Sequence, residues 1–296
     1  MIRNLKNCKH LFVLMLVLVI SGCDDDSGHN HDDHDHDVDA LTLDNCESSF
    51  GTGVDLFYST YFSCVDATIS GDNTVITSDN LPPYESWYYS ESNGNHIDYV
   101  SQGTGYYLNP NSISSQNLSV SIPDNPTSKG LTINEALVDG SVGTSGDEYG
   151  MGPVGVALNG VALFNPLAAP PDDIEDEKYS FDYYSGHPTF DGTYHYHTTT
   201  KGPLEVLLEK GLIETATVGS AEVELYGMMC DGTVILGCTE LDGSTPDNSG
   251  FDAQNGHVHD IGDGTTTFFT DRYHTHICTD IFTGFKFTPE IQYYEG

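Results

Sequence analysis

The chain has 296 residues, of which 45 are acidic and 9 are basic, so its formal net charge is −36. A surface this acidic repels nucleic acid and anionic lipid headgroups and favours cations, which excludes the nucleic-acid-binding classes. Hydrophobic residues make up 38% of the chain, which suffices for one sizeable core or two small ones. With 31 Gly, 18 Tyr and a single Trp, the composition favours a loop-rich β protein over a helical one.

Residues 1–22 have the pattern of a lipoprotein signal peptide. Three basic residues precede the uninterrupted apolar run Leu11–Ile20, which is too short to span a bilayer, since spanning takes about 20 residues. The run ends in Ile20-Ser21-Gly22-Cys23, which resembles a bacterial lipobox. We therefore predict cleavage before Cys23 and lipidation of that residue.

Lipidation would anchor the mature chain in the cell envelope, either on the periplasmic side of a membrane or at the cell surface. Its first segment, residues 23–44, is rich in Asp and His and has almost nothing to bury, so we expect a disordered tether. Two roles are open for this tether: a solvated spacer, or weak, exchangeable capture of Zn, Cu or Ni by histidines among carboxylates. These histidines are His29, His31, His34 and His36.

Export also determines how the other cysteines are interpreted, because disulfides are the default outside the cytoplasm. Cys46 and Cys64 form a candidate local bridge. The other three, Cys230, Cys238 and Cys278, cannot all pair with one another. One of these three is therefore free, bound to metal or paired elsewhere.

Residues 45–296 contain no recognisable linker, so we expect one mainly β domain there. Short alternating or β-branched runs, separated by turn signals, predict its strands. These runs include 74–77, 117–122 and 265–270. The stretch Pro203–Lys210, followed by Gly211, predicts one short helix. The acidic stretch 172–177 lacks the spacing of an EF-hand, and we expect a solvated loop.

Three blocks of this domain recur in the same order. The pairs are 155–164 with 226–236, 186–187 with 256–257, and 194–197 with 273–276, at offsets of 72, 70 and 79 residues. Ordered recurrence of this kind indicates an internal repeat. We predict a pseudo-duplicated core whose half-units, about 150–200 and 222–280, pack together.

Seven of the eight histidines outside the leader and tether lie in or directly beside the repeated blocks, and His96 is the exception. Residues 193–200 are strand-like, and alternate residues of a strand project to the same face. His195 and His197 would then rise side by side, and the Asp191-Gly192 turn would return His187 as a third ligand. The second block would repeat this arrangement. The predicted metal ligands are His187, His195, His197, His257, His259, His274 and His276.

Imidazole ligands suit transition metals such as Zn and Cu, whereas Ca and Mg prefer oxygen. Several points are open from the residues alone. Asp191 or Asp260 can serve as a ligand, an orienting group or a base. Cys278 shares strand parity with His276, so it completes either a His/Cys copper site or a disulfide. The two histidine sets can also form one shared site or two.

The sequence resembles the YHYH protein family, named after the tetrapeptide that stands here at 194–197. The supporting blocks occur in the family's order and span roughly residues 65–280. They are 109–116 (NPNSISSQ), 152–166 (GPVGVALNGVALFNP), 186–197 (GHPTFDGTYHYH), 255–263 (NGHVHDIGD) and 272–276 (RYHTH). Thr275 replaces a Tyr of the pattern, and Ser185 stands where the family often has Cys. The resemblance implies a secreted domain that contains histidines, and it implies no particular reaction.

Three function classes follow from these observations. The first is a membrane-anchored lipoprotein that captures or handles Cu or Zn, with the tether as feeder. The second is a metalloenzyme, either a hydrolase that uses metal-bound water or a copper oxidoreductase. The third is a structural or adhesive surface domain whose histidines are merely packed. The expected partners are a metal ion and the membrane through the N-terminal lipid, and no protein partner is indicated.

Overall fold

The computed structural model describes residues 43, 46–139, 146–169, 172–278 and 287–295, and residues 38–296 form one compact unit. The predicted signal peptide, Cys23 and the four tether histidines lie outside the described residues. Within the described part, no helix is both long and apolar enough to cross a membrane.

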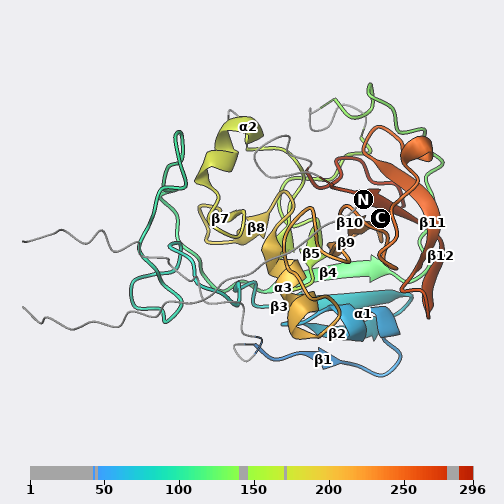
Figure 1. Cartoon of the computed structure of the whole chain (residues 1–296), viewed down its shortest axis with the longest axis horizontal. Coiled ribbons are helices and arrows are strands. Elements are labelled where there is room, and N and C mark those ends of the chain that lie inside the picture. The colour runs from blue at the N-terminus through green and yellow to red at the C-terminus, as the bar shows by residue number, and fades with distance from the viewer. Residues whose placement is uncertain (1–42, 44–45, 140–145, 170–171, 279–286, 296) are drawn as a thin grey trace, which may run out of the picture. The chain divides into compact units, whose positions relative to one another are not determined.

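A small sheet of four strands lies at the N-terminal end of the described chain and is accompanied by helix α1 (Figure 1). Its strands follow the order β1-β2-β3-β4. They are β1 (Ser49–Phe50), β2 (Asp66–Ser70), β3 (Asn73–Ser78) and β4 (Leu118–Pro123). Alternate residues of β4 are buried, as a sheet with one face on a core requires. The strands predicted at 74–77 and 117–122 are therefore confirmed.

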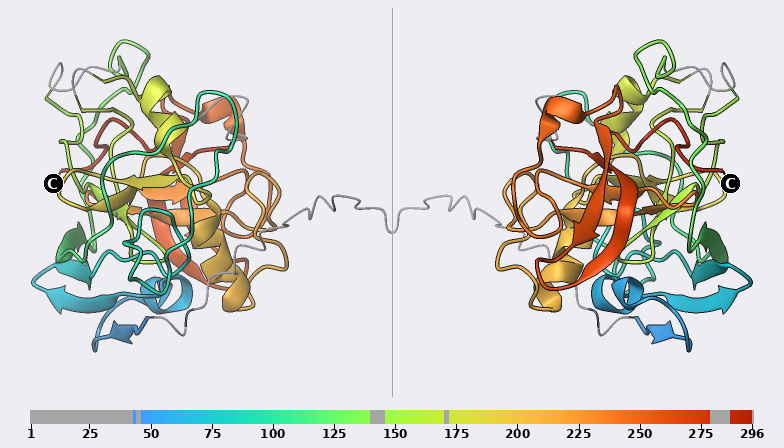
Figure 2. Two further views of the ribbon diagram at one scale, coloured as in Figure 1. Left: turned by 90° about the vertical axis from the view of Figure 1, so that its left-hand side faces the viewer. Right: turned by 90° about the vertical axis from the view of Figure 1, so that its right-hand side faces the viewer.

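The second sheet has eight strands in the order β11-β12-β10-β9-β5-β6-β8-β7. Their bounds are β5 (Gly155–Ala157), β6 (Ala162–Leu163), β7 (Gly186–Pro188), β8 (Tyr194–Tyr196), β9 (Leu225–Met229), β10 (Val234–Leu236), β11 (Gly256–Gly262) and β12 (Thr267–His276). Figure 1 shows β7 and β8 on one side of the central strands and β11 and β12 on the other. The right-hand view of Figure 2 faces the β11–β12 hairpin.

The order of this sheet is symmetric about its central pair, β5 and β9. These antiparallel strands pair Val156 with Met228, two residues that the 72-residue offset makes equivalent. The outer pairs repeat the same registers: His187 lies opposite His195 in the first half, and His257 lies opposite His274 in the second. The structure thus has two half-units related by a pseudo-twofold axis through the β5–β9 pair.

Equivalent tight turns begin both halves. Gly160, which follows Asn159, joins β5 to β6, and Gly232, which follows Asp231, joins β9 to β10. Both glycines have positive φ angles, of 76° and 96°. Left-handed backbone is strained for residues with a Cβ, so a three-residue hairpin loop requires glycine at this place. The recurrence of Asn/Asp-Gly between apolar runs therefore has a direct structural cause.

The described residues contain three α-helices and are mainly β, which confirms the expected fold class. Helix α3 (Lys201–Glu209) begins after Thr200, whose side chain caps the first turn, and it packs against β9. This helix was predicted at 203–210. Helices α1 (Leu56–Tyr61) and α2 (Ile174–Glu177) were not predicted, and the solvated loop expected at 172–177 is wrong. In both of these helices an Asp side chain caps the N-terminus, and buried side chains hold the short helix against the protein.

One large apolar cluster joins the facing sides of the two sheets with α1 and α3. It includes Ile76 and Val120 of the small sheet, Val156 and Met228 of the large sheet, and Leu204 of α3. Two disulfides, Cys46–Cys64 and Cys238–Cys278, add covalent links, and Cys230 is free. The core thus fixes the middle of the large sheet and leaves its two outer pairs to carry the histidines.

Candidate metal sites

Two groups of potential ligands lie in the outer parts of the large sheet. The first site consists of His187, His195 and His197, and the second site consists of Glu240, His257, His274 and His276. Four strands separate β8 from β12. The five spacings between these two strands, at about 4.8 Å each, place the sites roughly 24 Å apart along the sheet. Among the described residues, the ligands therefore form two separate groups and not one shared site.

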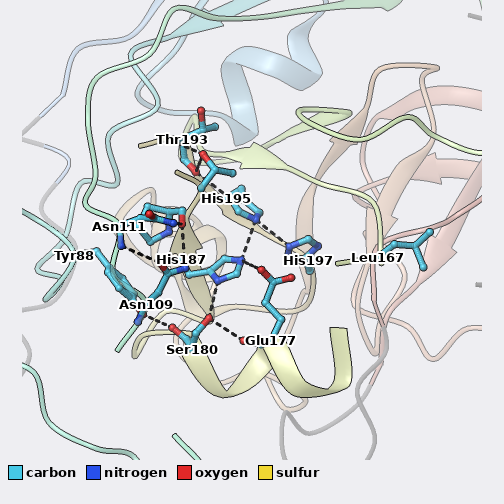
Figure 3. A network of polar contacts seen from close by, with 12 residues as sticks. Tyr88, Asn109, Asn111, Leu167, Glu177, Ser180, His187, Thr193, His195 and His197 are labelled. Carbon is cyan, nitrogen blue, oxygen red and sulfur yellow. Dashed lines mark hydrogen bonds and ion pairs between the residues drawn. The ribbon is translucent and has the colours of Figure 1, made fainter. Parts of the chain in front are cut away.

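The three imidazoles of the first site point toward one another (Figure 3). The Nε2 atom of His195 lies 3.1 Å from Nε2 of His187 and 2.9 Å from Nε2 of His197. Ligands held about 2.0–2.1 Å from one ion lie about 2.9–3.4 Å apart. The spacing of these nitrogen atoms is thus that of ligands around a single ion.

The opposite ring nitrogens determine the tautomers of these histidines. His195 Nδ1 donates to Thr193 O at 3.0 Å, and His197 Nδ1 donates to Asn165 O at 2.6 Å, because a carbonyl oxygen can only accept. Ser180 Oγ donates to the carbonyl of Glu177, so it accepts from His187 Nδ1 at 2.7 Å. Each neutral ring then carries its lone pair on Nε2, directed at the other two rings.

Burial keeps these rings neutral. It lowers the pKa of His187 and of His195 well below the usual 6.5, and neighbouring imidazoles lower both further. Burial likewise lowers the pKa of His197 to about 4. Leaving a buried acceptor unpaired costs about 1–3 kcal/mol, and three such lone pairs face one another here. A shared cation satisfies all three at once, whereas simple packing of the rings satisfies none.

Glycine and tyrosine explain the local sequence around these ligands. A Cβ atom at Gly186 would lie 2.5 Å from the ring of Tyr194, and one at Gly256 would lie 1.9 Å from the hydroxyl of Tyr273. Glycine before the first histidine therefore makes room for a tyrosine of the adjacent strand. Tyr194 donates to Asp182 at 2.7 Å, and this contact helps to fix the backs of the ligand-bearing strands.

The second site repeats the first and adds a carboxylate. His257 Nε2 lies 2.8 Å from His274 Nε2 and 3.3 Å from His276 Nε2. His274 Nδ1 donates to Arg272 O at 3.1 Å, and His276 Nδ1 donates to Gly237 O at 2.9 Å. These acceptors are the equivalents of those in the first site. His274 and His276 therefore have the same tautomers as His195 and His197 of the first site.

Glu240 faces all three histidines of the second site, with carboxylate oxygens 3.2–3.5 Å from their Nε2 atoms. Burial raises the pKa of Glu240, but the charge and the Nε2–H donors that His274 and His276 offer when they are protonated outweigh it and lower the pKa overall. Burial, followed by His274, lowers the pKa of His257 to about 4. Three imidazoles and one carboxylate form a four-ligand set of the kind that Zn²⁺ and Cu²⁺ accept.

A second carboxylate lies near the first site. Glu177, at the end of α2, has Oε1 3.8 Å from His187 Nε2, and Figure 3 shows its side chain directed at that ring. Burial raises the pKa of Glu177 to about 7. Sequence analysis missed both Glu177 and Glu240 as site residues. Glu240 has one signal in the sequence, since it replaces Ala168 at the 72-residue offset.

Several other candidates lie outside the two sites. His259 is exposed and stacks at 6.0 Å on His257, but it is not in the ligand group. Asp191 accepts hydrogen bonds from Thr189 and Thr193 in the β7–β8 turn, and Asp260 accepts one from Asp271 N. Cys278 pairs with Cys238, so it supplies no thiolate to the second site.

The family comparison matches residues 119–246 to the family described as YHYH protein. This span holds the first site and Glu240, whereas the three histidines of the second site follow it. No curated protein and no solved structure matches the chain. The resemblance seen in the sequence is confirmed over residues 119–246, which match the model of the YHYH protein family.

Proposed function

We propose that this chain is an exported, lipid-anchored protein that binds and handles copper or zinc at two histidine sites. The observation that carries the proposal is the convergence of Nε2 atoms whose rings are fixed, through Nδ1, by carbonyl or hydroxyl oxygens. Fixing a ring through its other nitrogen is how proteins orient histidine ligands. A set of merely packed histidines would leave buried lone pairs unpaired at both sites.

Charge and sequence outside the sites support the same function. The net charge of −36 raises the local concentration of cations near the protein. The Asp/His tether at 23–44 can collect ions weakly and pass them on to the better-formed sites. The lipobox-like sequence that ends at Cys23 would hold the protein at a membrane, where metal ions enter the cell envelope.

Metal content tests the proposal directly. We expect the purified protein to contain about two copper or zinc ions per chain by mass spectrometry. His195→Ala and His274→Ala should each remove one ion, while His259→Ala, a histidine beside the second site but outside it, should remove none. A variant with alanine at all four tether histidines corrects for ions held there. A protein that is metal-free and takes up neither Cu²⁺ nor Zn²⁺ would refute the proposal.

Lipid attachment is tested separately. Cys23→Ser should abolish incorporation of a labelled fatty acid and release the protein from the membrane fraction. Cys8→Ser, in the leader, is the matched control and should change neither. Fatty-acid labelling that persists in the Cys23→Ser protein would contradict lipidation at this residue.

A hydrolytic or oxidative metalloenzyme is the second candidate, and one observation favours it. A cavity of about 660 Å³ lies beside the second site and is lined by Glu240 and His257. A site that opens on a cavity can admit a water molecule or a substrate to the ion, and such water is acidified by the metal. Metal-dependent turnover that is lost in His274→Ala and retained in His195→Ala would support this candidate.

A further inference from the structure

The duplication gives this chain two similar sites, but only the first is closed by a cluster of apolar side chains. We infer that the second site exchanges its ion with the surroundings, whereas the first site retains its ion after folding. This inference rests on the proposed metal binding and assigns a different role to each half-unit. It is carried by the residues that close the first site and by those that replace them in the second.

The first site is closed by aromatic and aliphatic side chains. Its three imidazoles are between 1% and 3% exposed. The Phe164 ring stacks on His195 at 3.8 Å, and Phe181 packs edge-on against His187 at 4.9 Å. Phe181 in turn belongs to a small apolar cluster with Ala168 and with Ile174 of α2. For an ion to leave this site, these packed groups or the Glu177 side chain beside His187 must move.

The second site keeps the aromatic group and loses the rest of that cluster. Phe251, the equivalent of Phe181 at the 70-residue offset, stacks on His276 at 5.0 Å. At the same offset Ser244 replaces Ile174, and at the 72-residue offset Glu240 replaces Ala168. Both replacements are polar, and residues 244–247 form no helix over the site. The closing apolar cluster of the first half therefore has no counterpart in the second.

Two cavities lie beside the second site, which lacks that cluster. The 660 Å³ cavity is lined by Glu240, Ser244 and His257, so it reaches two of the ligands. A second cavity, of about 560 Å³, is lined by Phe251 and His276 and reaches a third ligand from another direction. The side chains of His257 and Glu240 are 14% and 12% exposed, whereas the three imidazoles of the first site are at most 3% exposed. Two of the four ligands, His257 and Glu240, are thus accessible to solvent, whereas the side chains of His274 and His276 are 0% and 1% exposed.

The chemistry of the larger cavity favours the entry of cations. Asp247 and Asp252 line it together with Glu240, and His259 stands beside them as an additional imidazole. Carboxylates around a concave entrance concentrate cations and repel anions. The path to the second site therefore suits a hydrated divalent ion. His259, which is not a ligand, is placed to contact an ion on its way in or out.

Isotope exchange tests this division. Protein loaded with two equivalents of natural zinc is mixed with excess enriched ⁶⁷Zn²⁺, and the isotopic composition of the bound zinc is followed by mass spectrometry. We expect two phases of similar amplitude, with one ion exchanging at least about tenfold faster than the other. A single phase for both ions would overturn the inference. Fewer than one bound ion before mixing would instead refute metal binding itself.

Variants assign each phase to a site. His274→Ala should remove the fast phase, and His195→Ala should remove the slow phase. Glu240→Gln is the milder change, because it keeps the side-chain volume and weakens one ligand, and it should accelerate the fast phase at least about threefold without altering the slow one. Loss of the fast phase in His195→Ala, or acceleration of the slow phase in Glu240→Gln, would assign the roles the other way and overturn the inference.

Discussion

The two half-units share strand order, register, tautomer-fixing hydrogen bonds and an aromatic ring against the histidines, yet they surround their sites differently. The first half closes its site with Ala168, Ile174 and Phe181. The second half keeps only the aromatic residue and adds the carboxylate of Glu240. A duplicated scaffold can thus keep the geometry of the ligands constant, while a few residues around each site change how accessible the ligands are and how the site is charged.

A covalent link also distinguishes the halves. The disulfide Cys238–Cys278 joins the chain after β10 to the chain after β12, two residues beyond His276. The corresponding residues of the first half are Pro166 and Thr199, so no such bridge exists there. The second site, which is the more accessible one, is therefore the site beside which a disulfide joins the chain.

Removal of this disulfide should have the largest effect on stability. The bridge closes a loop of 40 residues, and Cys238→Ala with Cys278→Ala should cost about 4 kcal/mol of unfolding free energy by the loop-entropy estimate. Denaturant titration measures the loss, and metal titration should show weaker binding at the second site only. Equal weakening at both sites would show that the bridge acts on the whole domain. Cys230→Ala, which removes the free thiol, is the control.

The second-largest effect on stability should come from a change in pH in the metal-free protein, through the buried His197. The folded pKa of His197 is about 4 and the unfolded one is 6.5, so the unfolded chain binds the proton that the folded protein refuses. The contribution of His197 to stability is therefore complete above pH 6.5 and is lost as the pH falls toward 4, by up to about 1.4 kcal/mol per pH unit.

Comparison with His197→Gln isolates this contribution, because other titrating groups are common to both proteins. Unfolding free energies of the two metal-free proteins, measured at intervals between pH 4 and 7, should give a shallower slope for the variant. Identical slopes would show that the ring is protonated in the folded state. Adding Zn²⁺ to the wild type should make the slope steeper toward pH 4, because an imidazole that binds metal cannot take up the proton that the unfolded chain binds.

Replacement of two equivalent tyrosines by phenylalanine should have a smaller effect on the unfolding free energy, and the effect should differ between the halves. Tyr194 donates to Asp182, and Tyr273 donates to Asp252 at 2.6 Å. Asp182 is only 2% exposed, whereas Asp252 is partly exposed to solvent. Asp182 keeps the hydrogen bonds from Ser86 and from two backbone amides, but water cannot replace the bond that the tyrosine donates to this buried carboxylate. Tyr194→Phe should therefore cost about 2–3 kcal/mol and Tyr273→Phe about 1 kcal/mol. Denaturant titration that gave equal losses would remove this distinction between the halves.

Strand parity and ordered recurrence predicted the histidines because both are local properties of the sequence. Six of the seven predicted ligands lie in the two groups. His259 obeyed the same parity with His257, but it lies opposite Arg272, on the side of His274 away from His276. Parity identifies the face of a strand, and it does not say in which direction along the strand the ion lies.

Glu240 could not be found by the same reasoning. It lies in a loop 17 residues before His257, and no local period connects the two. Its role depends on how the chain after β10 returns over the sheet, which is a tertiary property. The helix at 174–177 was missed for a related reason, since buried Ile174 holds a short acidic segment that propensity alone would leave as a loop.

Transfer of one wall residue from the first half to the second should have the smallest effect on stability and still test the comparison. Ser244 is exposed and lines the cavity, so Ser244→Ile should change the unfolding free energy by no more than about 0.5 kcal/mol. This change places at the second site the isoleucine that helps to close the first site, and zinc exchange at the second site should slow about three- to tenfold. Ser70→Ile, an exposed change in the small sheet, is the control and should leave both phases unaltered. If Ser244→Ile folds normally and exchange is unchanged, access to the second site is not governed by this wall, and the difference between the halves lies in the ligands themselves.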